Sequence, residues 1–323
     1  MSDDSDIPLE GDPTGGVAAS EALETAAIPQ ADDVGVDAST ERKQVRKERR
    51  QLLLRSPGFL FGASILIIWV LCAAVPSWFT KWGDNEVVRV DGSVIPRVGP
   101  RADAWFGTDK IGNDVFARII YGARPVLIVA VTAAVLAVAA GTLLGLTVGY
   151  FRGWVDEIVG RIIEALLSIP VILLAIMVLT TLGRSQTVII LTIAVLFIPV
   201  VTRTVRSAVL AEAQLDYVTS AKLRGENSLF VMTREILPNV TGVAVVELTV
   251  RIGYAIFTVA TLSFLGLNAG DSSAADWGRD LGKQYDTIQA GQWWAAIFPA
   301  LAIALLVIGV NLVADSLDRV NKS

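Results

Sequence analysis

Three ionisable residues stand inside or beside apolar stretches of this sequence: Glu164, Glu247 and Arg251. A charge within an apolar membrane-spanning segment is costly, so it usually has a partner or a function. Glu247 and Arg251 are four residues apart, and on a helix they would share one face and be able to pair. Two interpretations are open: the pair neutralises itself inside a bundle of helices, or the three side chains line a pathway for a polar solute.

Composition limits the other chemistry that this chain could perform. It has one cysteine, Cys72, and no histidine, whereas disulfides need two cysteines and zinc sites or catalytic dyads draw on imidazole or several thiolates. No Gly-x-x-x-x-Gly-Lys-Ser/Thr motif occurs, so the chain does not cradle nucleotide phosphates by that route. We therefore expect no catalytic residues, no metal site and no bound cofactor, and we disfavour an intramembrane enzyme.

The elements that carry these residues are predicted to be membrane helices. Hydrophobic residues make up 53% of the 323 residues and charged residues only 18%, which is typical of an integral membrane protein. Stretches long enough to cross a bilayer as helices, about 20 residues each, occur at 58–78, 124–150, 159–182, 187–204, 240–265 and 293–313. The predicted fold class is therefore all-α, with six transmembrane helices.

The residues that precede the spans fall into two parts. Residues 1–41 lack hydrophobic periodicity, and the first 40 hold ten Asp or Glu and no Lys or Arg, so we expect an acidic disordered tail. The basic juxtamembrane segment 42–57 contains seven Lys or Arg, which places the N-terminus in the cytoplasm by the positive-inside tendency. A nucleic-acid-binding arm is the alternative for the basic run, but its position favours lipid headgroups of the bilayer, and we expect no nucleic-acid partner.

This orientation places both termini in the cytoplasm and a long loop outside. The first transmembrane helix would occupy 58–80, the extracytoplasmic loop 81–121, and the core with five further helices 122–323. Asp91-Gly92 within alternating apolar and polar residues predicts a small β-hairpin in that loop. Further on, Thr108 or Asp109 is expected to cap a helix that lies along the outer membrane surface as an anchor rather than a gate.

A glycine repeat marks one face of the second span. Gly141, Gly145 and Gly149 recur every four residues, so they lie on the same side of a helix and let another helix approach closely. We interpret this pattern as helix packing.

A polar segment, "DYVTSAKLRGENSLFVMTREILPN", separates two apolar spans. Helix is favoured from Glu212 to about Phe230, with an interruption at Gly225, where the missing Cβ permits a sharp turn. Pro238 disfavours helix at Leu237 and is expected to start the next span. A plain connector would need only a few residues, so the length of this loop, 212–239, indicates a docking surface.

This segment resembles the "EAA" coupling loop of ATP-binding-cassette (ABC) importer permeases, in which Glu-Ala-Ala is followed by Gly and then by Ile-x-Leu-Pro at fixed spacing. Ala221, Gly225, Leu237 and Pro238 stand at the matching places, whereas Thr219, Ser220 and Glu235 depart from the general pattern. "DYVTSAKLRG" with "EILPN" is similar to the variant found in dipeptide, oligopeptide and nickel permeases.

The resemblance extends over nearly all of the chain from residue 58 onwards. It includes "FGTDKIGNDVFARIIYGAR", "GWVDEIVGRIIEALLSIP", "LSFLGL", the Trp-Gly at 277–278 and "NLVADSLDR", in the order of the family's second, C-type subunit. Asn113 stands in place of the family's usual Arg, Glu235 in place of His and Ala314 in place of Gly, while Glu247 and Arg251 are unusual in the fifth span. The acidic tail has no counterpart in the family pattern.

The resemblance implies a six-helix type I importer permease whose 212–239 loop docks, on the cytoplasmic side, into a groove of an ATPase subunit. The coupling residues carried over by position are Asp216, Tyr217, Ala221, Lys222, Arg224, Gly225, Leu237 and Pro238. The implied partners are a second permease subunit, ABC ATPase subunits that use ATP and Mg²⁺, and an extracytoplasmic solute-binding protein, all at a bacterial cytoplasmic membrane. The implied solutes are di- or oligopeptides, with nickel or another small solute as the alternative.

Two other function classes are weighed against this one. An ion-driven secondary transporter would usually show repeated halves with helices broken at the membrane midplane, and the sequence shows no such repeat. A purely structural membrane subunit stays open on sequence grounds. Dependence of transport on an ATPase partner would separate these classes.

Overall fold

The computed structural model describes residues 52–271 and 273–322, so the predicted acidic tail and most of the basic segment lie outside the described residues. The α-helices are α3 (Pro57–Ala74), α4 (Val115–Phe151), α5 (Gly153–Leu167), α6 (Val171–Leu182), α7 (Gln186–Glu212), α8 (Asp216–Leu223), α9 (Ser228–Phe230), α10 (Leu237–Phe264), α11 (Trp277–Gln284) and α12 (Trp294–Lys322). Short 3₁₀ turns cover Pro76–Trp78 and Tyr285–Ile288, and a π-helical turn covers Val231–Ile236.

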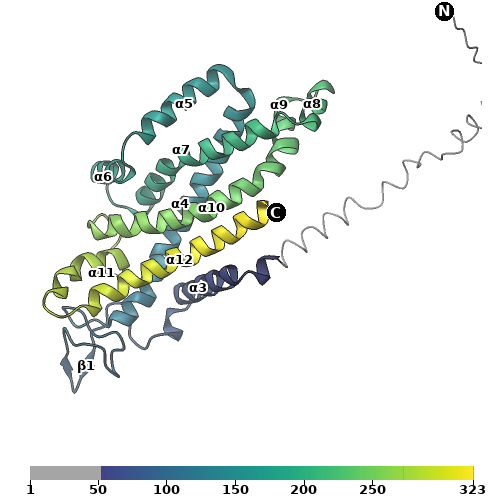
Figure 1. Cartoon of the computed structure of the whole chain (residues 1–323). Helices are drawn as coiled ribbons and strands as arrows, with labels where there is room; N and C mark the ends of the chain where they lie inside the picture. The colour runs from purple at the N-terminus through teal and green to yellow at the C-terminus, as the bar shows by residue number, and fades with distance from the viewer. Residues whose placement is uncertain (1–51, 272, 323) are drawn as a thin grey trace, which may run out of the picture. The chain divides into compact units, whose positions relative to one another are not determined.

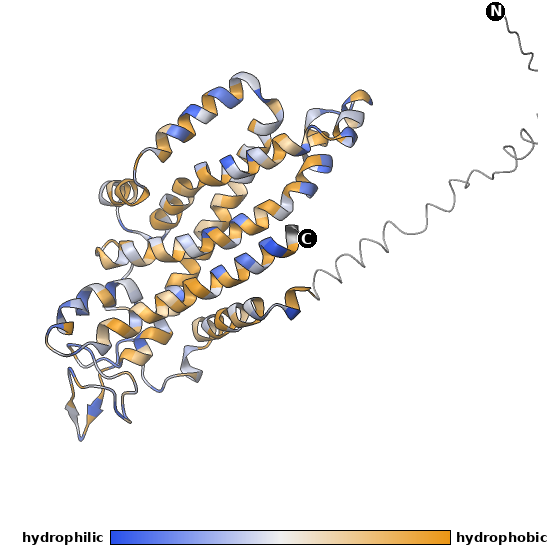
Figure 2. Ribbon diagram, in the orientation of Figure 1, coloured by the Kyte–Doolittle hydropathy of each residue, from blue (hydrophilic) through white to orange (hydrophobic). Residues whose placement is uncertain are grey.

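The predicted all-α membrane architecture is confirmed. Within the described residues, five helices are long and apolar enough to cross a bilayer, and the bent pair of α5 and α6 makes a sixth if it counts as one span. Apolar residues run along these helices, as Figure 2 shows for α3, α4, α7, α10 and α12. The bilayer core holds no water that could hydrogen-bond backbone N–H and C=O groups, so a membrane-spanning segment must pair these groups within itself, as a helix does.

The long helices form a bundle with two distinct ends. In Figure 1 the β-hairpin and α11 lie at one end, whereas α8 and α9 lie at the other. We call these the hairpin end and the α8 end. The principal core joins α3, α4, α7, α10 and α12, and a second apolar cluster lies beneath α8.

The glycine repeat of α4 packs against α7, as predicted. A Cβ on Gly141 would lie 2.6 Å from Cβ of Val201, and one on Gly145 would lie 2.9 Å from the carbonyl oxygen of Thr202. Gly149 is equally close to Val209. Since no real Cβ fits at such distances, the backbones of α4 and α7 approach as closely as only glycine allows.

The hairpin is also confirmed. Strands β1 (Arg89–Val90) and β2 (Ser93–Val94) pair antiparallel in the register Arg89↔Val94 and Val90↔Ser93. Asp91 and Gly92 both have positive φ, 51° and 80°, which is the conformation that a two-residue hairpin of this kind requires.

The prediction of a separate surface helix after Thr108 or Asp109 is wrong. The helix begins at Val115, is capped by Asp114, which accepts from the Ala117 amide over 2.9 Å, and continues unbroken into the second span. The Asp109 carboxylate instead accepts three hydrogen bonds from Ile111 and Asn113 and closes a loop. Because the Asp109 side chain bonds this local turn and does not cap a helix, the helix cap lies five residues later, at Asp114.

Two predicted spans also differ from the structure. α3 ends at Ala74 rather than near residue 78, because Pro76 follows and cannot continue the helix. The third span is not straight: α5 and α6 meet at an angle of 86° across Ser168, Ile169 and Pro170. Pro170 lacks an N–H and disfavours helix at the residue before it, so the chain turns there.

Candidate functional site

The 212–239 loop contains a complete helix-ending motif around Gly225. The Gly225 amide donates to the carbonyl of Lys222 over 3.0 Å, and the Glu226 amide donates to the carbonyl of Ala221 over 3.3 Å. Gly225 has φ +79°. This is the Schellman arrangement, in which a residue with left-handed backbone satisfies the last carbonyls of a helix, so the predicted turn at Gly225 is confirmed.

α8 has one face turned into the protein and one face turned away from it. Val218 and Ala221 are fully buried, in a cluster that also contains Val231 and Ile236. On the other side Leu223 is 84% exposed. Ala221 was predicted to contact a partner groove; its side chain instead has no exposed surface and packs inside this chain.

A hydrogen-bond network closes the base of the loop. The Tyr217 hydroxyl donates to the Glu212 carboxylate over 2.5 Å and accepts from the Asn239 amide over 2.8 Å. Asn239 also donates to the carbonyl of Glu235 over 2.9 Å. Burial and the hydrogen bond to Glu212 raise the pKa of Tyr217 to about 12, so the hydroxyl keeps its proton and joins the end of α7 to the start of α10.

The charged residues of α8 and of its C-cap, Arg224, are exposed, and each interacts with a neighbouring group. Asp216 lies in the first turn of α8, where a negative charge is favourable. Lys222 lies 5.1 Å from the ring centre of Tyr150, near the end of α4. Arg224 reaches Glu235 at 3.9 Å. The outer surface of the loop therefore combines charged side chains with an exposed leucine.

Pro238 lies in the first turn of α10, as predicted, but the expected loss of helix at Leu237 is wrong. Leu237 is helical, with φ −54° and ψ −43°, and its amide donates to the carbonyl of Met232, five residues earlier. The chain from Val231 to Ile236 forms a π-helical turn. α9, the π turn and α10 therefore form one continuous helix, Ser228–Phe264, which carries the loop into the fifth span.

The intramembrane residues Glu247 and Arg251 form the predicted pair. Arg251 Nε donates to Glu247 over 2.9 Å, and the two side chains are only 12% and 13% exposed. The Arg251 guanidinium also lies 5.0 Å from the ring centre of Tyr254 and 5.9 Å from that of Phe197 on α7. The pair is thus held at the α7–α10 contact by both charge and aromatic rings.

Glu164 lies elsewhere. It is exposed on α5 and lines a polar cavity of about 610 Å³ with Arg203 and Arg206 of α7. Arg206 pairs with Asp156 of α5 across the same cavity. In the described part of the chain no contact joins Glu164 to Glu247 or Arg251, so the three predicted pathway residues do not form one cluster.

Sequence reasoning missed the residues that close the loop and those that hold the hairpin end. Glu212 and Asn239 have no recognisable spacing with Tyr217, although a buried tyrosine hydroxyl generally needs a partner. At the hairpin end Arg118 pairs with Asp280 over 2.6 Å. A signal for Arg118 was available, because an arginine among Ile and Val residues near the start of a span is rarely left unpaired.

Comparison with known proteins decides which family this arrangement belongs to. Residues 141–322 match the model of the family described as "Binding-protein-dependent transport system inner membrane component". The chain belongs to this family. The match begins within α4, at the first glycine of the repeat, and covers the 212–239 loop and α12, so the protein is a permease subunit of an ABC importer and a multi-pass membrane protein.

Relatives of this permease carry transport names. It is 35% identical to a putative peptide transport system permease protein of Brucella suis over 269 residues, which cover 83% of this chain and 88% of the relative. It is 38% identical to the dipeptide transport system permease protein DppC of Alkalihalophilus pseudofirmus, over 68% of this chain and 71% of the relative. It is 39% identical to the glutathione transport system permease protein GsiD of Pectobacterium atrosepticum, over 68% and 72%.

Proposed function

We propose that this permease imports di- or oligopeptides across a bacterial cytoplasmic membrane, powered by ATPase subunits that bind the 212–239 loop. The relatives' names support the solute class, since they refer to peptides, dipeptides and glutathione, itself a small peptide. Nickel or another small solute is the alternative within the same class of permease.

The observation that carries the coupling role is the shape of the 212–239 loop. α8 protrudes at one end of the bundle and is joined by the continuous π-to-α10 helix to a span that reaches the other end. A force applied to α8 would therefore act directly on α10. Closure of an ATPase dimer could shift the spans between two arrangements in this way, with ATP and Mg²⁺ used only by the partner.

The exposed apolar surface of α5 supports the presence of a second permease subunit. α5 has no buried residue within this chain, and Trp154, Ile158 and Ile162 are each more than half exposed. Such an apolar surface suits a partner helix or lipid. A binding protein would deliver solute at the hairpin end, and the α8 end with both termini would face the cytoplasm.

Reconstitution tests this function. The permease, co-expressed with its partner permease and ATPase subunits, would be placed in proteoliposomes and supplied with solute-loaded binding protein. We expect uptake of labelled dipeptide only with ATP and Mg²⁺ and only when the ATPase subunits are present. Uptake by the permease alone, driven by an ion gradient, would instead identify a secondary transporter. ATP-driven uptake of nickel but not of peptide would reassign the solute.

A further inference from the structure

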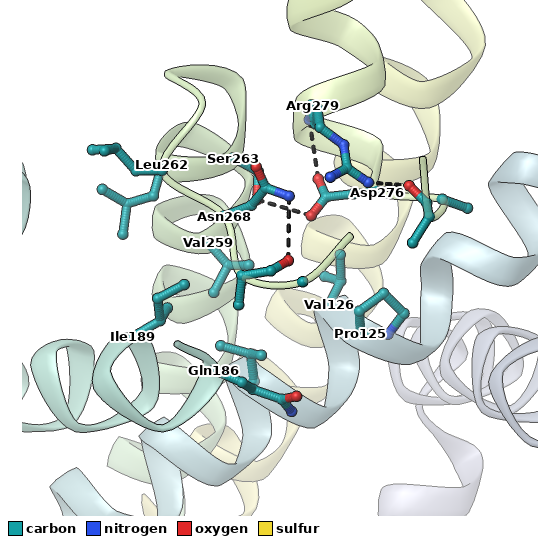
Figure 3. A pocket seen from close by; sticks show the side chains of 16 residues that line it. Pro125, Val126, Gln186, Ile189, Val259, Leu262, Ser263, Asn268, Asp276 and Arg279 are labelled. Atoms are coloured by element: carbon teal, nitrogen blue, oxygen red, sulfur yellow. Dashed lines mark hydrogen bonds between the residues drawn. The ribbon is translucent and has the colours of Figure 1, made fainter. Parts of the chain in front are cut away.

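A second site lies near the hairpin end, in a cavity of about 390 Å³ between α4, α7, α10 and the chain that follows α10. This volume is within the range of about 300–1,000 Å³ that is usual for ligand pockets. Its apolar wall includes Val126, Ile189 and Leu262, all buried. Figure 3 shows Ser263, Asn268, Asp276 and Arg279 gathered opposite Ile189, Gln186 and Pro125.

Asp276 and Arg279 are buried charges at this cavity, 9% and 7% exposed. The Asp276 carboxylate accepts only from neutral donors, the Ser263 hydroxyl and the Arg279 amide, each over 3.0 Å. Within residues 52–271 and 273–322, the Arg279 guanidinium donates to the backbone carbonyls of Asp271 and Ala274, and its Nε has no hydrogen-bond partner. Among the residues that the structure describes, neither charge has an opposite charge within 4.0 Å.

Buried charges that make only neutral contacts at hydrogen-bond distance are costly, because they have lost water without gaining a direct ion pair. The carboxylates of Asp271 and Asp280 attract Arg279 from beyond 4.0 Å, which replaces a direct partner only in part. A ligand that brings both an ammonium and a carboxylate would compensate both charges at once. We propose that this cavity binds a small zwitterionic solute, with its ammonium toward Asp276, its carboxylate toward Arg279 and an apolar side chain against Val126, Ile189 and Leu262. A free dipeptide is such a solute, so this inference rests on and deepens the proposed function.

Asp276 also caps α11, and a purely structural role must be separated from binding. Asparagine caps helices as well as aspartate does, so Asp276→Asn keeps the cap and removes the charge. Asp271→Asn is the matched control, because it removes an exposed carboxylate on the same loop that does not line the cavity, attracts Arg279 only from beyond 4.0 Å, and leaves the backbone carbonyl that binds Arg279 in place. Arg279→Gln tests the opposite charge, and the melting temperature of each variant reports on its folding.

Binding is measured directly, by saturation-transfer NMR on the purified permease complex in nanodiscs, without binding protein or ATP. The probes are leucyl-glycine, its N-acetyl form and its C-terminal amide. We expect Asp276→Asn to raise the Kd for leucyl-glycine by about tenfold, the loss of one charge-assisted hydrogen bond, and to leave the N-acetyl form unaffected. Arg279→Gln should weaken the binding of leucyl-glycine by a similar factor and leave the Kd of the C-terminal amide unchanged.

The outcomes separate this inference from the function on which it rests. Absence of saturable leucyl-glycine binding to wild type overturns the site, as does an unchanged Kd in Asp276→Asn or an equal loss in Asp271→Asn. Equal weakening of all three probes would also overturn it, since it would indicate a structural role. Binding with the expected pattern but without ATP-driven peptide uptake would support the site and overturn peptide import.

Discussion

The guanidinium of Arg118, near the start of α4, donates two hydrogen bonds to the carboxylate of Asp280 in α11, over 2.6 and 2.9 Å. Both side chains are less than a tenth exposed. Arg118 also donates to the backbone carbonyls of Asp84 and Ser273, each over 3.1 Å. One arginine thus ties together three segments of the hairpin end.

Removing one member of this buried pair should lower the free energy of unfolding far more than breaking an exposed pair. Arg118→Gln leaves the Asp280 carboxylate buried without its hydrogen-bonded counter-charge, which typically costs about 3–5 kcal/mol. Arg101→Gln breaks the exposed pair with Asp103 and should cost less than about 1 kcal/mol. Melting temperatures in detergent measure both, and similar values for the two variants would contradict the structural importance of Arg118.

Local patterns made the hairpin, the glycine repeat and the turn at Gly225 predictable. Each depends on residues close in sequence, or on one helical face, so its geometry follows from spacing alone. Arg118 and Asp280 are 162 residues apart, and no periodicity links them. The continuous helix through Leu237 was not predicted, because a proline disfavours helix at the residue before it. A π-helical turn at Val231–Ile236 precedes the proline, and no local pattern in the sequence indicates such a turn.

The proposed orientation predicts which end of the bundle is accessible from outside the cell. Cys72 is buried, so new cysteines can be placed without first removing it. A cysteine at Asp91 should react with an impermeant thiol reagent in intact cells, and one at Glu226 should react only after permeabilisation. Labelling of Glu226→Cys alone in intact cells would reverse the orientation.

Alkaline pH should reveal the role of Tyr217. The fold raises the pKa of Tyr217 to about 12, compared with about 10 for an unfolded tyrosine, so it favours the protonated hydroxyl. The resulting stability is fully present below pH 10 and is lost as pH rises through 12. The melting-temperature difference between wild type and Tyr217→Phe should therefore shrink across this interval. A Tyr285→Phe control, at an exposed tyrosine, should show no such trend.

Gly225 and Gly291 allow strain to be separated from coupling. Both have positive φ, +79° and +78°, and a Cβ on either would meet nothing within 4 Å. Valine at either position is therefore strained by its backbone and not by a clash, at a cost of about 1–2 kcal/mol. We expect Gly225→Val to lose co-purifying ATPase subunits and solute-stimulated hydrolysis, and Gly291→Val to keep both. Equal retention of ATPase subunits by the two variants would remove the coupling role from Gly225. Asparagine tolerates positive φ, so Gly225→Asn should keep part of the solute-stimulated hydrolysis.

The pair of Glu247 and Arg251 is the place where packing and transport are hardest to tell apart. Each side chain is nearly buried. Among the residues that the structure describes, Arg251 donates one side-chain hydrogen bond, through Nε, so its other guanidinium nitrogens can donate to a further partner. Glu247→Gln or Arg251→Gln alone leaves one charge unpaired, so we expect each to reduce the amount of folded permease, whichever role the pair has.

The double variant, Glu247→Gln with Arg251→Gln, resolves the two roles. If the side chains only neutralise each other, the double variant should recover folded protein and transport together, with a coupling energy of about 0.5–3 kcal/mol in the double-mutant cycle. If Arg251 also meets the carboxylate of a passing peptide, folded protein should recover while ATP-driven uptake stays low. We expect folded protein to recover without uptake, because the rings of Tyr254 and Phe197 position Arg251 and its remaining N–H groups can bind a carboxylate. Uptake by the double variant at the wild-type rate would limit the pair to a packing role.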